Sequence, residues 1–181
     1  MYITALQEIR WSEVGLNNVG NVVLFFSGND QNAHAFGTGV ELKKSLLNSV
    51  LISSRLATGC DFIRIGTFYN YSLISVHAST EDKDEGIKDL FDDLLEILLA
   101  QLPKQDMTLI LGDFNAKIGQ EKALRTDVGM QNLHNASDGN GRTVADLEAS
   151  NNMIIKSTMF DRLRWRDNIA SDLRKTITEV L

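Results

Sequence analysis

The stretch Met107–Gly119, which reads MTLILGDFNAKIG, decides how the whole chain is interpreted. Its first five residues are β-forming and mostly apolar, which predicts a buried strand. Gly112 removes the side chain at the point where the backbone must turn. Asp113 and Asn115 would then lie at the carboxyl end of this strand on one side of the backbone, with Phe114 pointing into the core. This arrangement would suit a carboxylate and an amide directed at one ligand, but for Asp-x-Asn alone an Asx turn after a strand is the more common alternative.

The sequence Leu-Gly-Asp-Phe-Asn-Ala-Lys-Ile-Gly resembles the hallmark motif of the endonuclease/exonuclease/phosphatase superfamily. It is most similar to the endonuclease domain of non-LTR retrotransposons and to craniofacial development protein 2-like sequences. The resemblance implies a four-layer α/β sandwich of the DNase I-like type, in which two β-sheets pack together and are flanked by helices. In that family the Asp and Asn of the motif bind and orient the scissile phosphate and its attacking water. These catalytic roles would fall on Asp113 and Asn115.

The composition is that of one ordinary globular domain. The 181 residues are 43% hydrophobic and 23% charged, with a net charge of −6 and a single cysteine, Cys60. One cysteine allows no internal disulfide, and no signal peptide or membrane span is evident, so we expect an intracellular protein, nuclear or cytoplasmic, without a membrane partner. The negative charge argues against a basic nucleic-acid-binding face. A phosphate substrate would therefore need local charge or a metal ion.

Glu8 follows a predicted strand over residues 2–6. Taken alone, it is explained more simply as a solvated side chain at a strand end. However, Gln7-Glu8 followed by Arg10-Trp11 resembles the second signature of the superfamily, whose glutamate binds the catalytic divalent metal. The resemblance therefore assigns metal binding to Glu8 together with Asp113. In the family a preceding strand ends in an Asn that helps to hold the phosphate, and this sequence begins after that point.

Five further β-forming runs predict one meandering sheet. The last run ends at His77, and a histidine at a strand end is often a hydrogen-bonded structural residue. In the family this strand ends in His or Tyr beside the scissile phosphate, so the resemblance makes His77 a catalytic candidate that stabilises or protonates the phosphoryl oxygens. Ser79 replaces a proline of the family's pattern. The runs cover residues 22–27, 38–43, 50–56, 62–68 and 73–77, with a loop over 28–35.

The strongest predicted helix lies between His77 and the motif strand. Its apolar residues recur at steps of three and four, which predicts one stripe packed on the core and an acidic face in solvent. Pro103 is expected to end the helix. This strand–helix–strand crossover would bring His77 and Asp113 to one edge of the sheet. We expect Glu8 and Asn115 to converge there too. The stripe consists of Ile87, Leu90, Phe91, Leu94, Leu95, Leu98, Leu99 and Leu102.

A polar segment rich in turn residues follows the motif. It resembles the family's Leu-His and Asn-Gly segment, which organises the mouth of the active site. The resemblance makes His134 and Asn140 candidate substrate-binding residues, and ordinary turn chemistry explains them equally well. A helix over residues 143–150, a cap at Asn151-Asn152 and a strand over 153–157 are expected next.

The last twenty residues depart from the family. There the family continues with two strands and a final Ser-Asp-His, whose Asp and His complete the catalytic centre. Apolar residues at helical spacing instead predict an amphipathic helical tail over 161–181, beside a partial domain over 1–160. The resemblance thus extends over residues 2–160. The apolar residues of the tail are Ile169, Leu173, Ile177 and Val180.

The mechanism that the resemblance implies is divalent-metal-assisted phosphodiester hydrolysis with DNA as the substrate. Mg²⁺, with Mn²⁺ as a substitute, prefers carboxylate oxygens together with water and phosphate, which suits Glu8 and Asp113. Because the family's upstream Asn and terminal His have no counterpart in the sequence, we expect low activity or none. Two alternatives stay open. One is a phosphatase of the same fold, and the other is an inactive remnant that serves as a binding or structural module.

Overall fold

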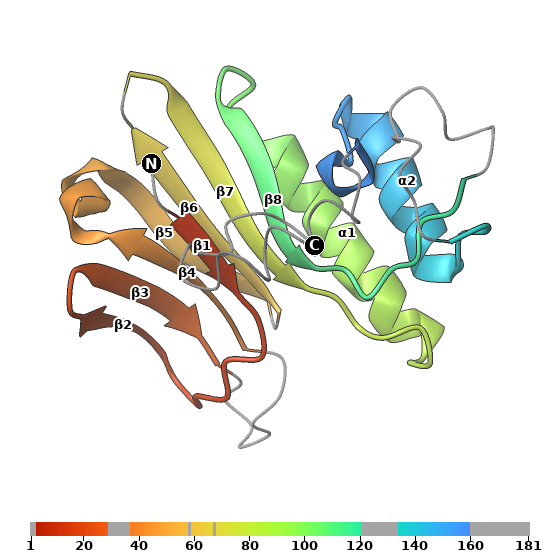
Figure 1. The fold of residues 1–181 in the computed structure, drawn as a ribbon, viewed down its shortest axis with the longest axis horizontal. Helices are drawn as coiled ribbons and strands as arrows, with labels where there is room; N and C mark the ends of the chain where they lie inside the picture. The colour runs from red at the N-terminus through yellow and green to blue at the C-terminus, as the bar shows by residue number, and fades with distance from the viewer. Residues whose placement is uncertain (1–2, 29–36, 58, 67, 121–133, 160–181) are drawn as a thin grey trace, which may run out of the picture.

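A computed structural model describes residues 3–28, 37–57, 59–66, 68–120 and 134–159, in which eight strands form two four-stranded sheets (Figure 1). The first sheet is antiparallel and has the order β1-β4-β3-β2. Its strands are β1 (Ile3–Leu6), β2 (Val14–Val19), β3 (Val22–Ser27) and β4 (Thr38–Lys43). The second sheet has the order β5-β6-β7-β8, and only its β7–β8 pair is parallel. Its strands are β5 (Val50–Ala57), β6 (Cys60–Gly66), β7 (Asn70–His77) and β8 (Met107–Asp113).

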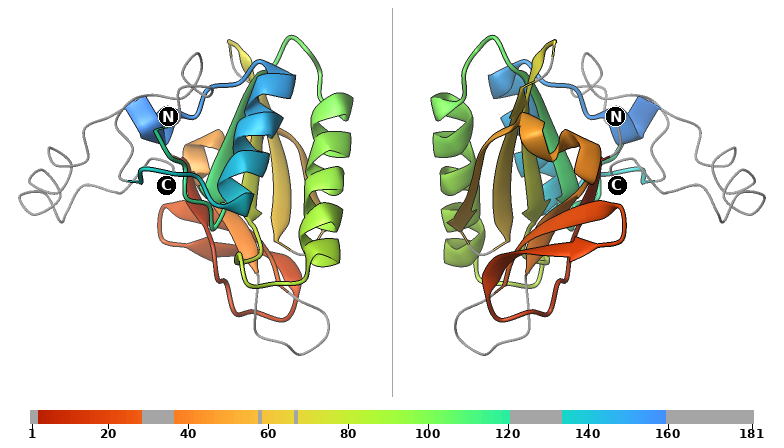
Figure 2. Two further views of the ribbon diagram at one scale, coloured as in Figure 1. Left: turned by 90° about the vertical axis from the view of Figure 1, so that its right-hand side faces the viewer. Right: turned by 90° about the vertical axis from the view of Figure 1, so that its left-hand side faces the viewer.

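The helices lie on the outer face of the second sheet. Helix α1 (Glu85–Gln101) connects β7 to β8, and α2 (Gly139–Asn151) packs beside it. Figures 1 and 2 show both helices on the side of the second sheet that faces away from the first sheet. Two short 3-10 helices complete the described elements, η1 (Lys44–Ser49) and η3 (Lys156–Met159). No helix in the described ranges is long and apolar enough to cross a membrane.

Strand β7 is buried on both faces because it lies between two hydrophobic cores. Leu73 faces the first sheet, whereas Ile74 and Val76 face the helices. A strand covered on both faces can carry apolar residues in succession rather than in alternation, which explains the adjacent pair Leu73-Ile74. The core between the sheets contains Ile3, Val40, Leu42, Ile63, Ile65 and Leu73. The core under the helices contains Cys60, Phe62, Ile74, Val76, Leu95, Leu98 and Leu147.

The predicted α/β sandwich of two packed sheets is confirmed. Within the described residues both α-helices lie on one side, so three of the four expected layers are present. The prediction of one meandering sheet is wrong, because β3 and β4 belong to the first sheet and β5 to the second. The 3-10 turn η1 carries the chain from one sheet to the other. A β-forming run identifies a strand, but it does not identify the strand's partners.

Two boundaries after the motif also differ from prediction. Helix α2 begins four residues earlier than expected, because the Asp138 side chain accepts a hydrogen bond from Gly141 N at 2.8 Å and caps the helix at that point. The predicted strand over 153–157 is wrong. Ile155 instead begins a turn, since its carbonyl accepts from Thr158 N at 3.2 Å and from Thr158 Oγ1 at 2.7 Å. The predicted cap is present, with Asn152 in the left-handed conformation.

Helix α1 has two apolar faces. Its end before Pro103 is as predicted, and the Asp84 side chain caps its start. Leu95 and Leu98 are buried in the core, but part of the predicted stripe is not. The expectation that the whole stripe packs on the core is therefore wrong. The exposed apolar residues are Ile87 at 54%, Leu90 at 61%, Leu94 at 36% and Ile97 at 54%.

The loop predicted over 28–35 lies, apart from Gly28, outside the described residues. The helical tail predicted over 161–181 lies wholly outside them. The edge strand β2 was not predicted. It is largely exposed on both faces, so its sequence carries no burial alternation that would identify it as a strand.

Candidate active site

The parallel pairing of β7 and β8 places His77 directly opposite Asp113. Beyond this pair the strands stay joined, because Ala78 N donates to the carbonyl oxygen of Asp113 at 2.8 Å. Gly112 allows β8 to lie this close to β7. Its φ is 138°, and a Cβ atom at this position would lie 2.0 Å from the Val76 carbonyl oxygen. The sequence therefore needs glycine at the turn for a steric reason as well as a conformational one.

The loop after β8 is fixed by the motif's own polar side chains. Asp113 Oδ1 accepts from Asn115 N at 2.8 Å, which is the Asx turn foreseen as the alternative. Asn115 adopts a left-handed φ of 47°, a conformation that asparagine tolerates better than most residues. Its Nδ2 donates to the Ala78 carbonyl oxygen at 2.8 Å. The second oxygen of Asp113 and Oδ1 of Asn115 take no part in these bonds and remain acceptors for a ligand.

His77 lies next to this loop, on its buried side. Its ring is buried, and its backbone N donates to the Gly59 carbonyl oxygen at 2.8 Å. Alternation along β7 puts the side chain on the face that looks toward the first sheet. Asp113, its partner, is exposed. The pair thus joins a buried imidazole to a solvent-accessible carboxylate at the edge of the sheet.

Glu8 follows β1, which ends at the same edge as β7 and β8 in Figure 1. It has a left-handed φ of 54°, and its side chain is exposed. Oε2 of this side chain lies 3.6 Å from Nη2 of Arg10. The next residue anchors the turn, since Ile9 N donates to the Gly37 carbonyl oxygen at 2.9 Å. An exposed ion pair of this kind contributes little stability, so it does not restrain the Glu8 carboxylate strongly.

Asn140 ties three segments together from the first turn of α2. Its Nδ2 donates to the carbonyl oxygens of Ser79 at 2.9 Å and Asn115 at 3.0 Å. The amide group thus holds the motif loop against the loop that follows His77. This is a structural use of the side chain, unlike the substrate contact proposed from the resemblance. His134 is exposed in the loop that precedes α2.

Asp138 and Glu81 fix the start of α2. Asp138 Oδ1 accepts from Lys117 N at 3.0 Å, which attaches the end of the motif loop to the helix. Glu81 accepts from Gly139 N at 3.2 Å and from Asn140 N at 2.9 Å. A carboxylate at a helix N-terminus also meets the positive end of the helix dipole. Glu81 was not predicted from the sequence, because its partners lie almost sixty residues further along the chain.

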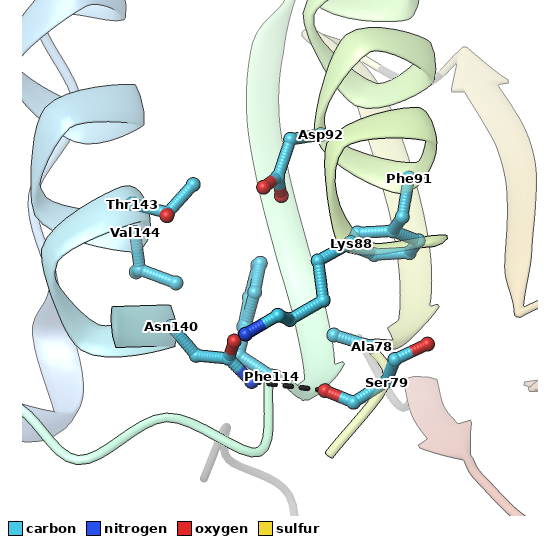
Figure 3. A pocket seen from close by; sticks show the side chains of 9 residues that line it. All are labelled: Ala78, Ser79, Lys88, Phe91, Asp92, Phe114, Asn140, Thr143 and Val144. Carbon is cyan, nitrogen blue, oxygen red and sulfur yellow. Dashed lines mark hydrogen bonds between the residues drawn. The ribbon is translucent and has the colours of Figure 1, made fainter. Parts of the chain in front are cut away.

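A small pocket lies on the helix side of the motif loop, between α1 and α2 (Figure 3). Phe114 forms part of its wall, so the pocket is behind the site rather than in front of Asp113. Burial raises the pKa of Asp92 in this wall to about 6, and the nearby carboxylates of Asp89, Glu96 and Asp93 add to the rise. The lining residues are Ala78, Ser79, Lys88, Phe91, Asp92, Phe114, Asn140, Thr143 and Val144.

The oxygen donors at the edge match the preferences of a hard cation. Mg²⁺ commonly uses one or two carboxylates and completes its shell with water and substrate phosphate. Glu8 and Asp113 are carboxylates of this kind, and both are exposed. In the part of the chain that the structure describes, no three His, Cys, Asp or Glu side chains gather closely enough to hold a metal ion. Two carboxylates would leave most of the coordination shell of such a cation to water and substrate.

The two packed sheets with helices on one face define an α/β two-sheet sandwich, consistent with a DNase I-like fold. The chain is 27% identical over 165 residues to craniofacial development protein 2 from Tragulus javanicus, and equally to that from Bos taurus. Each match covers 88% of this chain but only 28% and 27% of the respective relative, so the chain spans just over a quarter of their length. No protein-family model and no solved structure matches the chain. The predicted likeness to craniofacial development protein 2-like sequences is confirmed.

Proposed function

We propose that the chain is a divalent-metal-dependent phosphodiester hydrolase domain of the endonuclease/exonuclease/phosphatase superfamily, similar to a retrotransposon-type DNA endonuclease domain. The observation that supports this most strongly is the parallel pairing of β7 and β8. It sets His77 opposite Asp113, and the Asx turn and the bond to Ala78 hold Asn115 beside them. A histidine, a carboxylate and an amide at one sheet edge are the groups that phosphate chemistry uses.

Each residue has a chemical role in this proposal. Glu8 and Asp113 would hold Mg²⁺ or Mn²⁺, which neutralises charge on the phosphate while water attacks. Asn115 orients the water through its Oδ1, or the phosphate through the second N–H of its Nδ2, because the first N–H is already donated to the Ala78 carbonyl oxygen. His77 stabilises or protonates the phosphoryl oxygens from the buried side. DNA is the proposed substrate.

The activity that we propose for these 181 residues, expressed as given, is low. The family's terminal Ser-Asp-His has no counterpart in this sequence. A positioned general acid or base contributes about 10²–10⁴-fold to rate, so we expect hydrolysis at least about a hundredfold slower than in a complete domain. His77 does not take over this role, since the resemblance already assigns it to another position of the family.

Supercoiled plasmid incubated with the protein and Mg²⁺ tests the proposal. We expect slow nicking that Asp113→Ala abolishes and that Asp93→Ala leaves unchanged, because Asp93 is an exposed carboxylate on α1 away from the proposed site. Release of inorganic phosphate from a nucleotide, without nicking, would instead identify a phosphatase. Nicking that survives in Asp113→Ala would contradict the assignment of Asp113.

A non-catalytic binding module is the second candidate. It is favoured because Asp113 Oδ1 already accepts from Asn115 N within the motif loop, and Asn115 Nδ2 already donates to the Ala78 carbonyl oxygen. Fluorescence anisotropy with labelled duplex DNA separates the two candidates. Binding without any nicking in Mg²⁺ or Mn²⁺ would favour the module, whereas nicking would exclude it.

A further inference from the structure

A buried carboxylate joins the two sheets. Asp61 Oδ1 on β6 accepts from Ser27 Oγ at 2.6 Å, and its Oδ2 accepts from Thr38 Oγ1 at 2.7 Å. Ser27 and Thr38 are register partners on β3 and β4, so both donors come from the first sheet and the acceptor from the second. The three residues are 8%, 3% and 0% exposed, respectively. We call Asp61, Ser27 and Thr38 the Asp61 clamp.

The clamp lies next to the backbone bonds that hold the candidate site residues. On the first sheet, Thr38 follows Gly37, whose carbonyl oxygen accepts from Ile9 N at 2.9 Å, directly after Glu8. On the second sheet, Asp61 is two residues beyond Gly59, whose carbonyl oxygen accepts from His77 N at 2.8 Å. One short path therefore leads from the clamp to Glu8, and another leads to His77 and its partner Asp113.

The chemistry of the clamp differs from that of the rest of the sheet interface. Elsewhere the two sheets meet through apolar side chains such as Leu42, Ile63 and Leu73. Apolar contacts hold sheets together without fixing an exact separation, whereas a buried carboxylate costs free energy unless directional hydrogen bonds satisfy it. Ser75, the register partner of Asp61, is fully buried as well. The polar part of the interface is thus the part nearest the candidate site.

We propose that Asp61 is a positioning residue, which holds the turn that carries Glu8 at a fixed separation from the His77–Asp113 pair. By doing so it sets the affinity of the site for a divalent cation. That a divalent cation binds at this site rests on the proposed function, whereas the coupling between the two sheet edges does not.

Two measurements test this, namely hydrogen exchange at the amides of Ile9 and His77, and the dissociation constant for Mn²⁺. Thr38→Val keeps the shape of the side chain but removes the donor, whereas Thr38→Ser keeps the donor. We expect Thr38→Val to lower protection at both amides relative to the core amide of Ile74. It should also weaken Mn²⁺ binding several-fold, less than the roughly tenfold or more that follows loss of a group bonded directly to a metal ligand. Thr38→Ser and wild type should agree in both readouts.

Asp106→Asn is the matched control. Asp106 is also a buried acceptor, bonded by Arg64 at 2.6 and 3.0 Å and by Ser72 at 2.9 Å, but it precedes β8 at the opposite end of the sheet. Asp61→Asn should change both readouts, whereas Asp106→Asn should lower stability without changing either. All variants are compared at a temperature at which each is fully folded.

The outcomes are distinct. Unchanged amide protection or unchanged Mn²⁺ affinity in Thr38→Val would overturn the inference. An equal loss of protection and affinity in Asp106→Asn would overturn it as well, since general destabilisation would then explain the result. If wild type binds no Mn²⁺, the proposed metal function fails. The exchange measurement still decides whether the clamp couples the two edges.

Discussion

Gly112 controls the approach of β8 to β7. Because a Cβ atom would lie 2.0 Å from the Val76 carbonyl oxygen and the φ is 138°, Gly112→Ala must displace backbone. We expect a loss of roughly 3 kcal/mol in the free energy of unfolding, measured by urea denaturation. Gly86→Ala on α1 is the control, since the nearest atom to its new Cβ is 3.7 Å away. It should change stability by no more than about 1 kcal/mol. Equal effects of the two variants would contradict the steric argument.

Asp92 predicts a pH dependence of stability. Its pKa is raised from 3.8 to about 6, so the folded chain binds more protons than the unfolded chain between these values. Stability should therefore fall as pH rises through this range. Asp92→Asn removes the titration. The free energy of unfolding of the variant, measured relative to that of wild type, should rise by on the order of 1 kcal/mol from pH 4 to pH 7, after allowance for solvent screening. A difference that stays constant across this range in urea unfolding would contradict the prediction.

Residue types at the site could be predicted from the sequence, but their bonds could not. The motif identified Asp113 and Asn115 and correctly predicted that Phe114 packs into the core. The bond from Asn115 Nδ2 to Ala78 spans 37 residues, and no local pattern encodes it. Asp61 was missed for the same reason, because it reads as an ordinary polar residue until two sheets close around it.

At the scale of the elements, we expect substitutions on the two apolar faces of α1 to have different effects on stability. Leu95 and Leu98 are buried in the core, whereas Leu90 and Ile97 are mostly exposed. Leu95→Ala and Leu98→Ala should each cost about 2–4 kcal/mol of unfolding free energy in urea, because they leave cavities. Leu90→Ala and Ile97→Ala should cost less than about 1 kcal/mol. A large loss in Leu90→Ala would show that another surface covers this face.

The elements that local pattern predicted well are those with a clear β-forming run or strong helical spacing. The bounds of β3 and β4 match the predicted runs, and the β7–α1–β8 crossover is confirmed. The failures have physical causes. Strand β2 has no buried face to produce alternation, and the apolar run at 153–157 is too short to distinguish a strand from a turn.

At the scale of the whole molecule, the class of fold was predicted from the motif and its resemblance rather than from composition. Composition indicated one globular domain and no more. The division into two sheets depends on long-range pairing, in which β1 joins β4 across more than thirty residues. Such pairing is decided by packing between sheets, which a single sequence does not display.

Titration calorimetry with Mg²⁺ and Mn²⁺ tests the central claim most directly, since the proposed chemistry requires a cation at the edge shared by β1, β7 and β8. We predict weak binding by the wild-type chain that is lost in Asp113→Ala and in Glu8→Gln, because the two carboxylates supply the protein's charged ligands. Asp93→Ala, which removes an exposed carboxylate on α1, should bind as wild type does. Equal affinity in wild type and Asp113→Ala would place the cation elsewhere and contradict the account.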